Sequence, residues 1–140
     1  MQISIIATMY RSASYLAEFC RRASAAALQC CDDYEIILVN DGSPDDSVQV
    51  ALGLRAENPR IKVIDLARNH GHHKAIMIGL AHTLGELVFL LDVDLEEAPE
   101  LLIEMHKTLH DKHADIVYGV QIARQGGWFK RTTGEWFYRL

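Results

Sequence analysis

The hydrophobic residues of this chain fall into short, unbroken runs that are separated by longer stretches with helical spacing. Five runs rich in Ile, Val and Leu do not alternate with polar residues: 3–7, 35–39, 62–66, 87–91 and 115–120. Such runs are expected for strands covered on both faces, which is how parallel sheets are built. Four intervening stretches repeat apolar residues at helical intervals: 13–28, 45–56, 73–84 and 99–112.

The alternation of five strands with four helices predicts an α/β fold. Right-handed strand-helix-strand units would build a three-layer, doubly wound domain with a mainly parallel sheet. We assign residues 1–120 to this domain and residues 121–140 to a separate basic and aromatic segment. Because that segment stops without a helix cap and its aromatic residues have no evident partner, we expect a truncated chain. A packed final helix is the alternative interpretation.

Charge and cysteine content narrow the classes of function. The formal net charge of −5, with no basic face in the first hundred residues, argues against nucleic-acid binding. Cys20, Cys30 and Cys31 are an odd set that is poorly placed for a disulfide framework, which indicates a reducing, cytoplasmic compartment. No run is long enough to span a membrane, and the amino end has no export signal.

Polar clusters follow the predicted strands at their carboxyl ends. In an open parallel sheet, ligands bind beyond this edge. Residues 8–12, 40–43 and 92–96 follow the first, second and fourth strands, so they would line one crevice. The basic loop 68–74 follows the third strand at the same edge of the sheet, and we call the loops at this edge the rim. This loop suits contacts with phosphate or sugar. The motifs of dinucleotide, P-loop and nucleophile-elbow sites are missing from the sequence.

Asp92 and Asp94 are the most informative pair on this rim. Their spacing at the end of a strand points both carboxylates the same way. Adjacent carboxylates repel, and Mg²⁺ or Mn²⁺ held by one or two carboxylates plus substrate phosphates is a common solution. Glu96 could supply a third oxygen. Alternatively, Asp92 caps a turn while the other acids favour the amino end of the next helix.

Two further features allow more than one interpretation. Asp41, followed by Gly42 in a sharp turn, could accept hydrogen bonds from a base or ribose, but an Asx turn or helix cap is the simpler interpretation of the isolated segment. His106 and His110 stand four residues apart, with His113 nearby. Because no cysteine or carboxylate completes a zinc site there, we interpret them as a polar helix face.

Taken together, three segments resemble the family 2 glycosyltransferases with the GT-A fold. Residues 4–12 (SIIATMYRS) are similar to their first strand and nucleotide-contact loop, and residues 35–43 (EIILVNDGS) to their base-binding turn. Residues 90–100 (LLDVDLEEAPE) are similar to their Asp-x-Asp metal motif. RNHGHHKAIMIGL, DIVYGVQIAR and WFKRTTGEWFYRL resemble the branch that loads sugars onto polyprenyl phosphates.

The resemblance implies a role for each matching residue. It makes Asp92 and Asp94 catalytic, and assigns Mg²⁺ or Mn²⁺ to Asp94 and Glu96. The nucleotide contacts that it implies are Thr8, Tyr10, Asn40, Asp41 and Asp92. The contacts to an acceptor phosphate that it implies are Arg124, Lys130 and Arg131, in an acceptor half that would be incomplete.

The expected activity is hexose transfer, with inversion, from a UDP- or GDP-linked sugar to a polyprenyl phosphate. The resemblance places this step in the making of cell-envelope polysaccharide, with peripheral contact at the inner face of the membrane. A truncated, non-catalytic nucleotide-binding module that partners a full-length transferase is the alternative. A nucleotidyltransferase is disfavoured because its Gly-rich basic loop after the first strand is missing.

Overall fold

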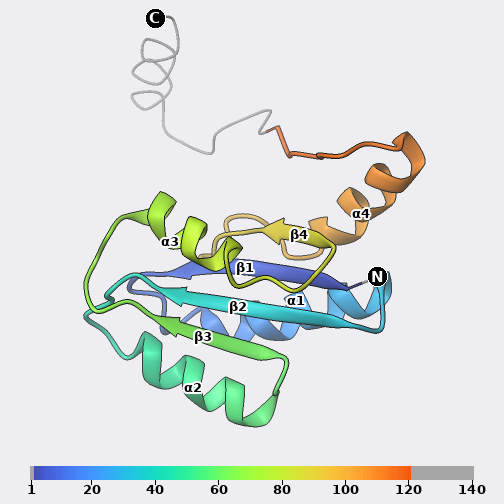
Figure 1. Ribbon diagram of the computed structural model, residues 1–140. Coiled ribbons are helices and arrows are strands. Elements are labelled where there is room, and N and C mark those ends of the chain that lie inside the picture. Colours follow the sequence, from blue (N-terminus) through green and yellow to red (C-terminus); the bar gives the residue numbers. More distant parts are fainter. Residues whose placement is uncertain (1, 121–140) are drawn as a thin grey trace, which may run out of the picture.

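A parallel sheet of four strands forms the centre of residues 2–120, the part of the chain that this computed structural model describes. The strands are β1 (Ile3–Met9), β2 (Tyr34–Asn40), β3 (Ile61–Asp65) and β4 (Leu87–Leu90). Their order is β3-β2-β1-β4, and every neighbouring pair is parallel (Figure 1). All four strands therefore end at one edge, the C-terminal edge of the sheet.

Helices cover both faces of this sheet. On one face lie α1 (Leu16–Cys30), α2 (Ser47–Glu57) and α4 (Leu101–Lys112), and on the other lies α3 (His72–Leu80) (Figure 1). Successive residues of β1 point to opposite faces of the sheet. Ile5 packs in the same core as Phe19 of α1, whereas Ile6 packs with Ala75 of α3. The predicted three-layer α/β architecture is confirmed.

The predicted fifth strand is wrong within the described residues. Residues 115–120 follow α4 but form no strand. Ile116, Tyr118 and Val120 are 80%, 78% and 73% exposed. A strand requires a partner for its backbone groups, and residues 115–120 do not pair with the outer edge of β4, which is open within residues 2–120. An apolar run alone therefore does not suffice to make a strand.

The first helix begins later than its apolar spacing predicts, at Leu16 and not at residue 13. The backbone N–H of Ser12 donates to Ser47 Oγ at 3.0 Å, and that of Ala13 donates to Asp45 Oδ2 at 3.2 Å. Asp45 lies in the loop after β2, and Ser47 is the first residue of α2. They hold the first residues of the expected helix in a loop instead.

A buried carboxylate stabilises the opposite edge of the sheet. Glu35 of β2 is 3% exposed and accepts hydrogen bonds from Ser4 Oγ at 2.6 Å and from the Leu84 backbone N–H at 2.7 Å. Its other oxygen lies 2.5 Å from Lys62 Nζ. Burial raises the pKa of Glu35, but hydrogen bonds from Lys62, Ser4 and Leu84 outweigh it and leave the pKa below its ordinary value. This ionised group ties the α3–β4 loop to three strands, so α3 ends at Leu80 and not at residue 84.

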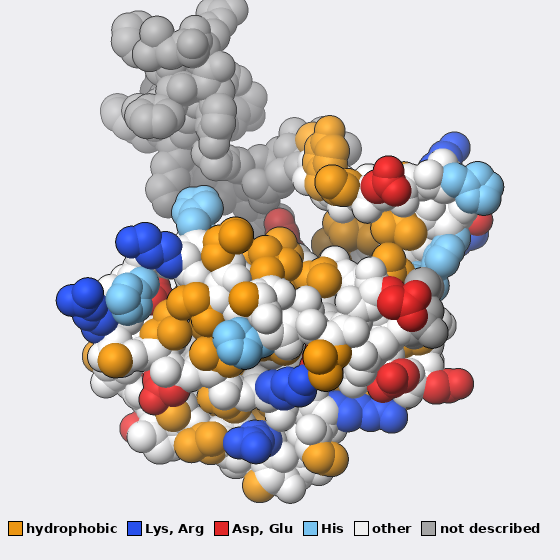
Figure 2. All heavy atoms as spheres, in the orientation of Figure 1, with side chains coloured by type: hydrophobic (Ala, Val, Ile, Leu, Met, Phe, Trp, Pro, Cys, Tyr) orange, Lys and Arg blue, Asp and Glu red, His pale blue; other side chains and the backbone are white. Residues whose placement is uncertain are grey.

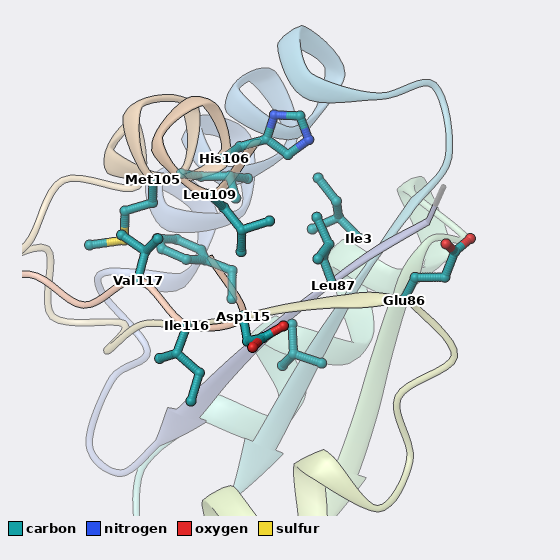
Figure 3. A pocket seen from close by; sticks show the side chains of 12 residues that line it. Ile3, Glu86, Leu87, Met105, His106, Leu109, Asp115, Ile116 and Val117 are labelled. Atoms are coloured by element: carbon teal, nitrogen blue, oxygen red, sulfur yellow. The ribbon is translucent and has the colours of Figure 1, made fainter. Parts of the chain in front are cut away.

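A groove lies between β4, α4 and residues 115–117, away from the C-terminal edge (Figure 3). Its volume is about 270 Å³, and most of its lining is apolar, including Leu87, Phe89 and Met105. In the described part of the chain, no helix combines the length and the apolar character that crossing a membrane requires.

We expect Glu35→Ala to lower the free energy of unfolding by about 2–3 kcal/mol, because it leaves the buried Ser4 hydroxyl and the Leu84 amide without their acceptor. Urea denaturation followed by circular dichroism measures the change. Glu57→Ala, at an exposed position at the end of α2, is the matched control and should change stability by less than about 0.5 kcal/mol. Equal denaturation midpoints for the two variants would contradict the structural role of Glu35.

Candidate functional site

Asp45 joins two of the loops at the C-terminal edge. Its Oδ1 accepts hydrogen bonds from the Ser47 hydroxyl at 2.6 Å, from the Ser47 backbone N–H at 3.2 Å and from the Ser43 hydroxyl. Its Oδ2 accepts the Ala13 backbone N–H. The β1–α1 loop and the β2–α2 loop are therefore fixed to each other through one carboxylate.

The Asp45 carboxylate is held in its ionised form. Burial raises the pKa of Asp45, but hydrogen bonds from the hydroxyls of Ser43 and Ser47 and from the backbone N–H groups of Ala13 and Ser47 lower it more. The resulting pKa is about 2, against an ordinary value of 3.8. The connection between the loops is thus fully formed at neutral pH.

Asp41 makes a second connection, between β2 and the loop before α3. It is 3% exposed and accepts the backbone N–H groups of His70 at 2.6 Å and Gly71 at 3.0 Å. Gly71 has φ +92° and Gly42 has φ +63°, conformations that glycine adopts most readily. Both Asp41 oxygens therefore already support the rim, and a nucleotide base would have to share them.

Both polar atoms of the Asn40 side chain form hydrogen bonds within the fold. It is 2% exposed, its Nδ2 donates to Asp65 Oδ1 at 2.7 Å, and its Oδ1 accepts the Ser43 backbone N–H at 3.1 Å. These contacts join the ends of β2 and β3 and shape the turn that follows. Its predicted nucleotide contact stays a prediction, and the structure gives the side chain a clear role in the rim.

Asp92 and Asp94 point outward from the end of β4, as their spacing predicts. Leu91 and Val93 are 6% and 1% exposed, whereas the alternate Asp92 and Asp94 are exposed. Asp94 Oδ1 accepts the backbone N–H of Glu96 at 3.0 Å, which forms a tight turn. Leu95 within this turn has φ +61°, a strained conformation for a leucine.

His72 lies between two predicted site residues. Its Nδ1 shares a hydrogen bond of 3.0 Å with Thr8 Oγ1 and lies 3.8 Å from Asp92 Oδ1. Thr8 is near the end of β1, His72 begins α3 and Asp92 follows β4. The fold thus brings together a strand residue, a helix residue and one of the paired aspartates from three separate segments of the chain.

Cationic and hydrogen-bonding groups surround this cluster. The exposed side chains in and after the β3–α3 loop are Arg68, His70, His72, His73 and Lys74. Lys, Arg and His side chains gather at this end of the molecule in Figure 2. Tyr10 is 47% exposed, and the Arg11 guanidinium lies 5.6 Å from the centre of its ring. The rim offers an open face suited to an anionic, partly aromatic ligand.

The donor set at this edge fits a hard divalent cation that keeps part of its coordination shell for a ligand. Asp92 and Asp94 provide exposed carboxylate oxygens, the type of donor that Mg²⁺ and Mn²⁺ prefer. Within residues 2–120, no three His, Cys, Asp or Glu side chains converge on one point. Glu96 is therefore not gathered with the two aspartates, and substrate phosphates would have to complete such a shell. The predicted acceptor residues Arg124, Lys130 and Arg131 lie outside the described residues.

Sequence reasoning missed the roles of Asp45, Ser47 and His72. It treated Asp45 only as part of a helix start, and it placed His72 on the rim without a partner. The alternation of Ser43, Asp45 and Ser47 is a signal that could have indicated a hydroxyl-carboxylate network. Nothing in the local sequence indicates the contact of His72 with Thr8, because 64 positions separate them.

A sequence profile described as Glycosyl transferase family 2 matches residues 4–140 of the chain. A Mycobacterium tuberculosis protein named for glycosyltransferases is 50% identical over 139 residues, which are 99% of this chain and 41% of that protein. The uncharacterized glycosyltransferase YkcC of Bacillus subtilis is 35% identical over 141 residues, 100% of this chain and 43% of that protein. The chain thus spans less than half the length of these relatives.

Solved structures share the fold. The crystal structure of S. aureus TarS 1-349 has a TM-score of 0.66 and 24% identity, over 89% of this chain and 39% of that one. The mannosyltransferase PcManGT from Pyrobaculum calidifontis has a TM-score of 0.63 and 21% identity, over 76% of this chain and 32% of that one.

We expect Gly42→Ala to disturb the rim, because the new Cβ would lie 2.5 Å from the carbonyl carbon of Arg68 and the residue has φ +63°. The free energy of unfolding should fall by about 1–3 kcal/mol. Gly53→Ala on α2 is the matched control, since nothing lies within 4 Å of its added Cβ. That variant should be stabilised by roughly 0.5–1 kcal/mol. Gly42→Ala with unchanged stability in urea would refute the tight contact between the two loops.

We expect Asp45→Asn to weaken the dependence of stability on acid pH. A carboxylate with a pKa of about 2 when folded and 3.8 ordinarily stabilises the fold above about pH 4, and this contribution is lost as the pH falls through 2. The variant should be less stable at neutral pH by about 1–2 kcal/mol, with the difference shrinking toward pH 2. Urea denaturation midpoints of the variant and the original chain, measured at several pH values from neutral to pH 2, test this expectation. A difference that does not change with pH would contradict the ionised network.

Proposed function

The chain belongs to glycosyl transferase family 2, and from this we propose that it takes part in moving a hexose from a nucleotide diphosphate sugar to an acceptor. Its sheet has the GT-A arrangement of the solved transferases. The observation that carries the proposal is the convergence of Thr8, His72 and the paired aspartates at the C-terminal edge. Ligands of open parallel sheets bind at this edge.

The donor that we propose is a UDP- or GDP-linked sugar. Two observations on related folds support this class: PcManGT was solved with GDP-Man and Mn²⁺, and TarS 1-349 was solved with UDP-GlcNAc and with UDP. In this chain the base and ribose would lie over Tyr10 and beside Asp41. The diphosphate would extend toward the basic rim formed by Arg68 and Lys74.

We propose that Asp92 and Asp94 hold Mg²⁺ or Mn²⁺ together with the substrate phosphates, and that Glu96, which is not gathered with them, would join only after a movement of its turn. When bound, the cation would neutralise charge on the diphosphate leaving group. His72 would orient Asp92 from its position against Thr8. Because α3 begins at His72, its positive helix end also faces this region and favours a negatively charged ligand.

For the acceptor we propose a polyprenyl phosphate at the inner face of the membrane. A phosphate monoester is an anion at neutral pH, so its oxygen can attack the anomeric carbon without a general base. The new bond forms as the bond from that carbon to the diphosphate breaks, which gives inversion. Arg124, Lys130 and Arg131 would bind the acceptor phosphate, and the neighbouring aromatic side chains would contact the membrane interface.

We expect Asp94→Asn to weaken metal-dependent binding of UDP or GDP by about tenfold or more, because one carboxylate of the pair loses its charge. Calorimetric titration with and without Mn²⁺ measures the effect. Asp32→Asn, an exposed substitution in the α1–β2 loop, is the matched control and should bind like the original chain. The metal assignment fails if Asp94→Asn retains full metal-dependent affinity.

Turnover is measured separately from binding. We expect radiolabelled sugar to appear on polyprenyl phosphate when the chain, Mn²⁺ and lipid are combined with the correct donor. Nucleotide binding without transfer, together with stimulation of a full-length transferase, would instead support a non-catalytic partner module. Absence of any nucleotide binding would contradict both functions.

A further inference from the structure

Two imidazole rings face each other on α4, away from the C-terminal edge. The Nε2 atoms of His106 and His110 lie 3.2 Å apart, and the ring centroids lie 4.5 Å apart with a 70° angle between the planes. The two residues are separated by one turn of the helix. Without an ion, the Nε2–H group of one ring can donate a hydrogen bond to the Nε2 atom of the other.

The same geometry suits a metal ion shared by both rings. Imidazole nitrogens bind Zn²⁺ at about 2.0–2.1 Å, so two nitrogens 3.2 Å apart would subtend an angle of about 100° at the ion. That angle lies between those of square-planar and tetrahedral coordination. We propose that His106 and His110 form a binding site for a late transition-metal dication such as Ni²⁺ or Zn²⁺, distinct from the aspartates at the C-terminal edge.

Metal binding requires the neutral form of both rings. Burial, and secondarily the charge of His110, lower the pKa of His106 below its ordinary value. Both rings must then carry their remaining protons on Nδ1, so that the two Nε2 lone pairs point to the ion.

The site is open. Because no third His, Cys, Asp or Glu side chain within residues 2–120 joins the pair, water would fill the other coordination positions. His106 also lines the groove between α4, β4 and residues 115–117, together with the carboxylates of Glu86 and Asp115 (Figure 3).

Calorimetric titration of the tag-free chain with Ni²⁺ tests the site, in excess Mg²⁺ so that carboxylate sites are occupied. Ni²⁺ is chosen because it suits imidazole, whereas Zn²⁺ would compete for the thiols of Cys30 and Cys31. We expect one Ni²⁺ per chain. His106→Gln and His110→Gln should each weaken binding by at least roughly tenfold, since even outer-shell partners of a ligand change metal affinity by that factor. His82→Gln at the end of α3 is the matched control and should bind like the original chain.

A second readout does not depend on the folding of any variant. Paramagnetic Ni²⁺ should broaden the imidazole proton resonances of His106 and His110 at substoichiometric concentration, and leave those of His82 sharp. Ni²⁺ affinity that survives both substitutions, or broadening that appears first at His70, His72 or His73, would overturn the proposal. A chain that binds no Ni²⁺ would overturn it as well. None of these outcomes depends on the activity proposed for the other edge.

Discussion

Irregular loops need acceptors for their backbone N–H groups, and in this chain carboxylates supply them. Buried amides without a partner cost about as much as a lost hydrogen bond each. Asp41 accepts the amides of His70 and Gly71, and Asp45 accepts those of Ala13 and Ser47. The parallel sheet brings the loops to one edge, but these charge-assisted hydrogen bonds fix their positions there. The geometry of the candidate site depends on them.

This arrangement separates two groups of acidic residues at the C-terminal edge. Asp41 and Asp45 are turned into the protein, where they hold the rim in place. Asp92 and Asp94 are turned outward, where they are available to a cation and a phosphate ligand. His72 connects the groups, since it follows the loop that Asp41 holds and contacts Thr8 beside Asp92. A rigid inner ring and an accessible outer pair are the properties that a preorganised binding site requires.

Much of the fold could be predicted from the sequence because each strand is a short apolar run, and the central strands β1 and β2 are buried on both faces. Four apolar runs fall where β1, β2, β3 and β4 are found, within two residues at each end. The strand prediction for 115–120 failed because an apolar run does not reveal whether its backbone pairs with a neighbouring strand, and here it does not pair with β4. The predicted start of α1 was wrong because Asp45 and Ser47, more than thirty positions further along the chain, hold the residues before α1 in a loop.

The candidate site was predictable only in part. The outward direction of Asp92 and Asp94 follows from strand alternation, and the structure agrees. The sequence could not show that Asp41 and Asn40 are buried, or that His72 contacts Thr8, because these contacts join segments far apart in the chain. The family assignment supplies the reaction class, and the geometry of the rim supplies the location proposed for the bound nucleotide.

The most direct test of that location is a two-dimensional amide NMR titration of the chain with UDP and with GDP in the presence of Mg²⁺. The site described here requires that the bound nucleotide shift amide resonances in the loops after all four strands, including Arg11, Gly42, Gly71 and Asp94. The amides of Leu84 and Gly85, at the opposite edge, should not move. Shifts concentrated instead around β4, α4 and the groove between them would place the nucleotide elsewhere and contradict the proposed site.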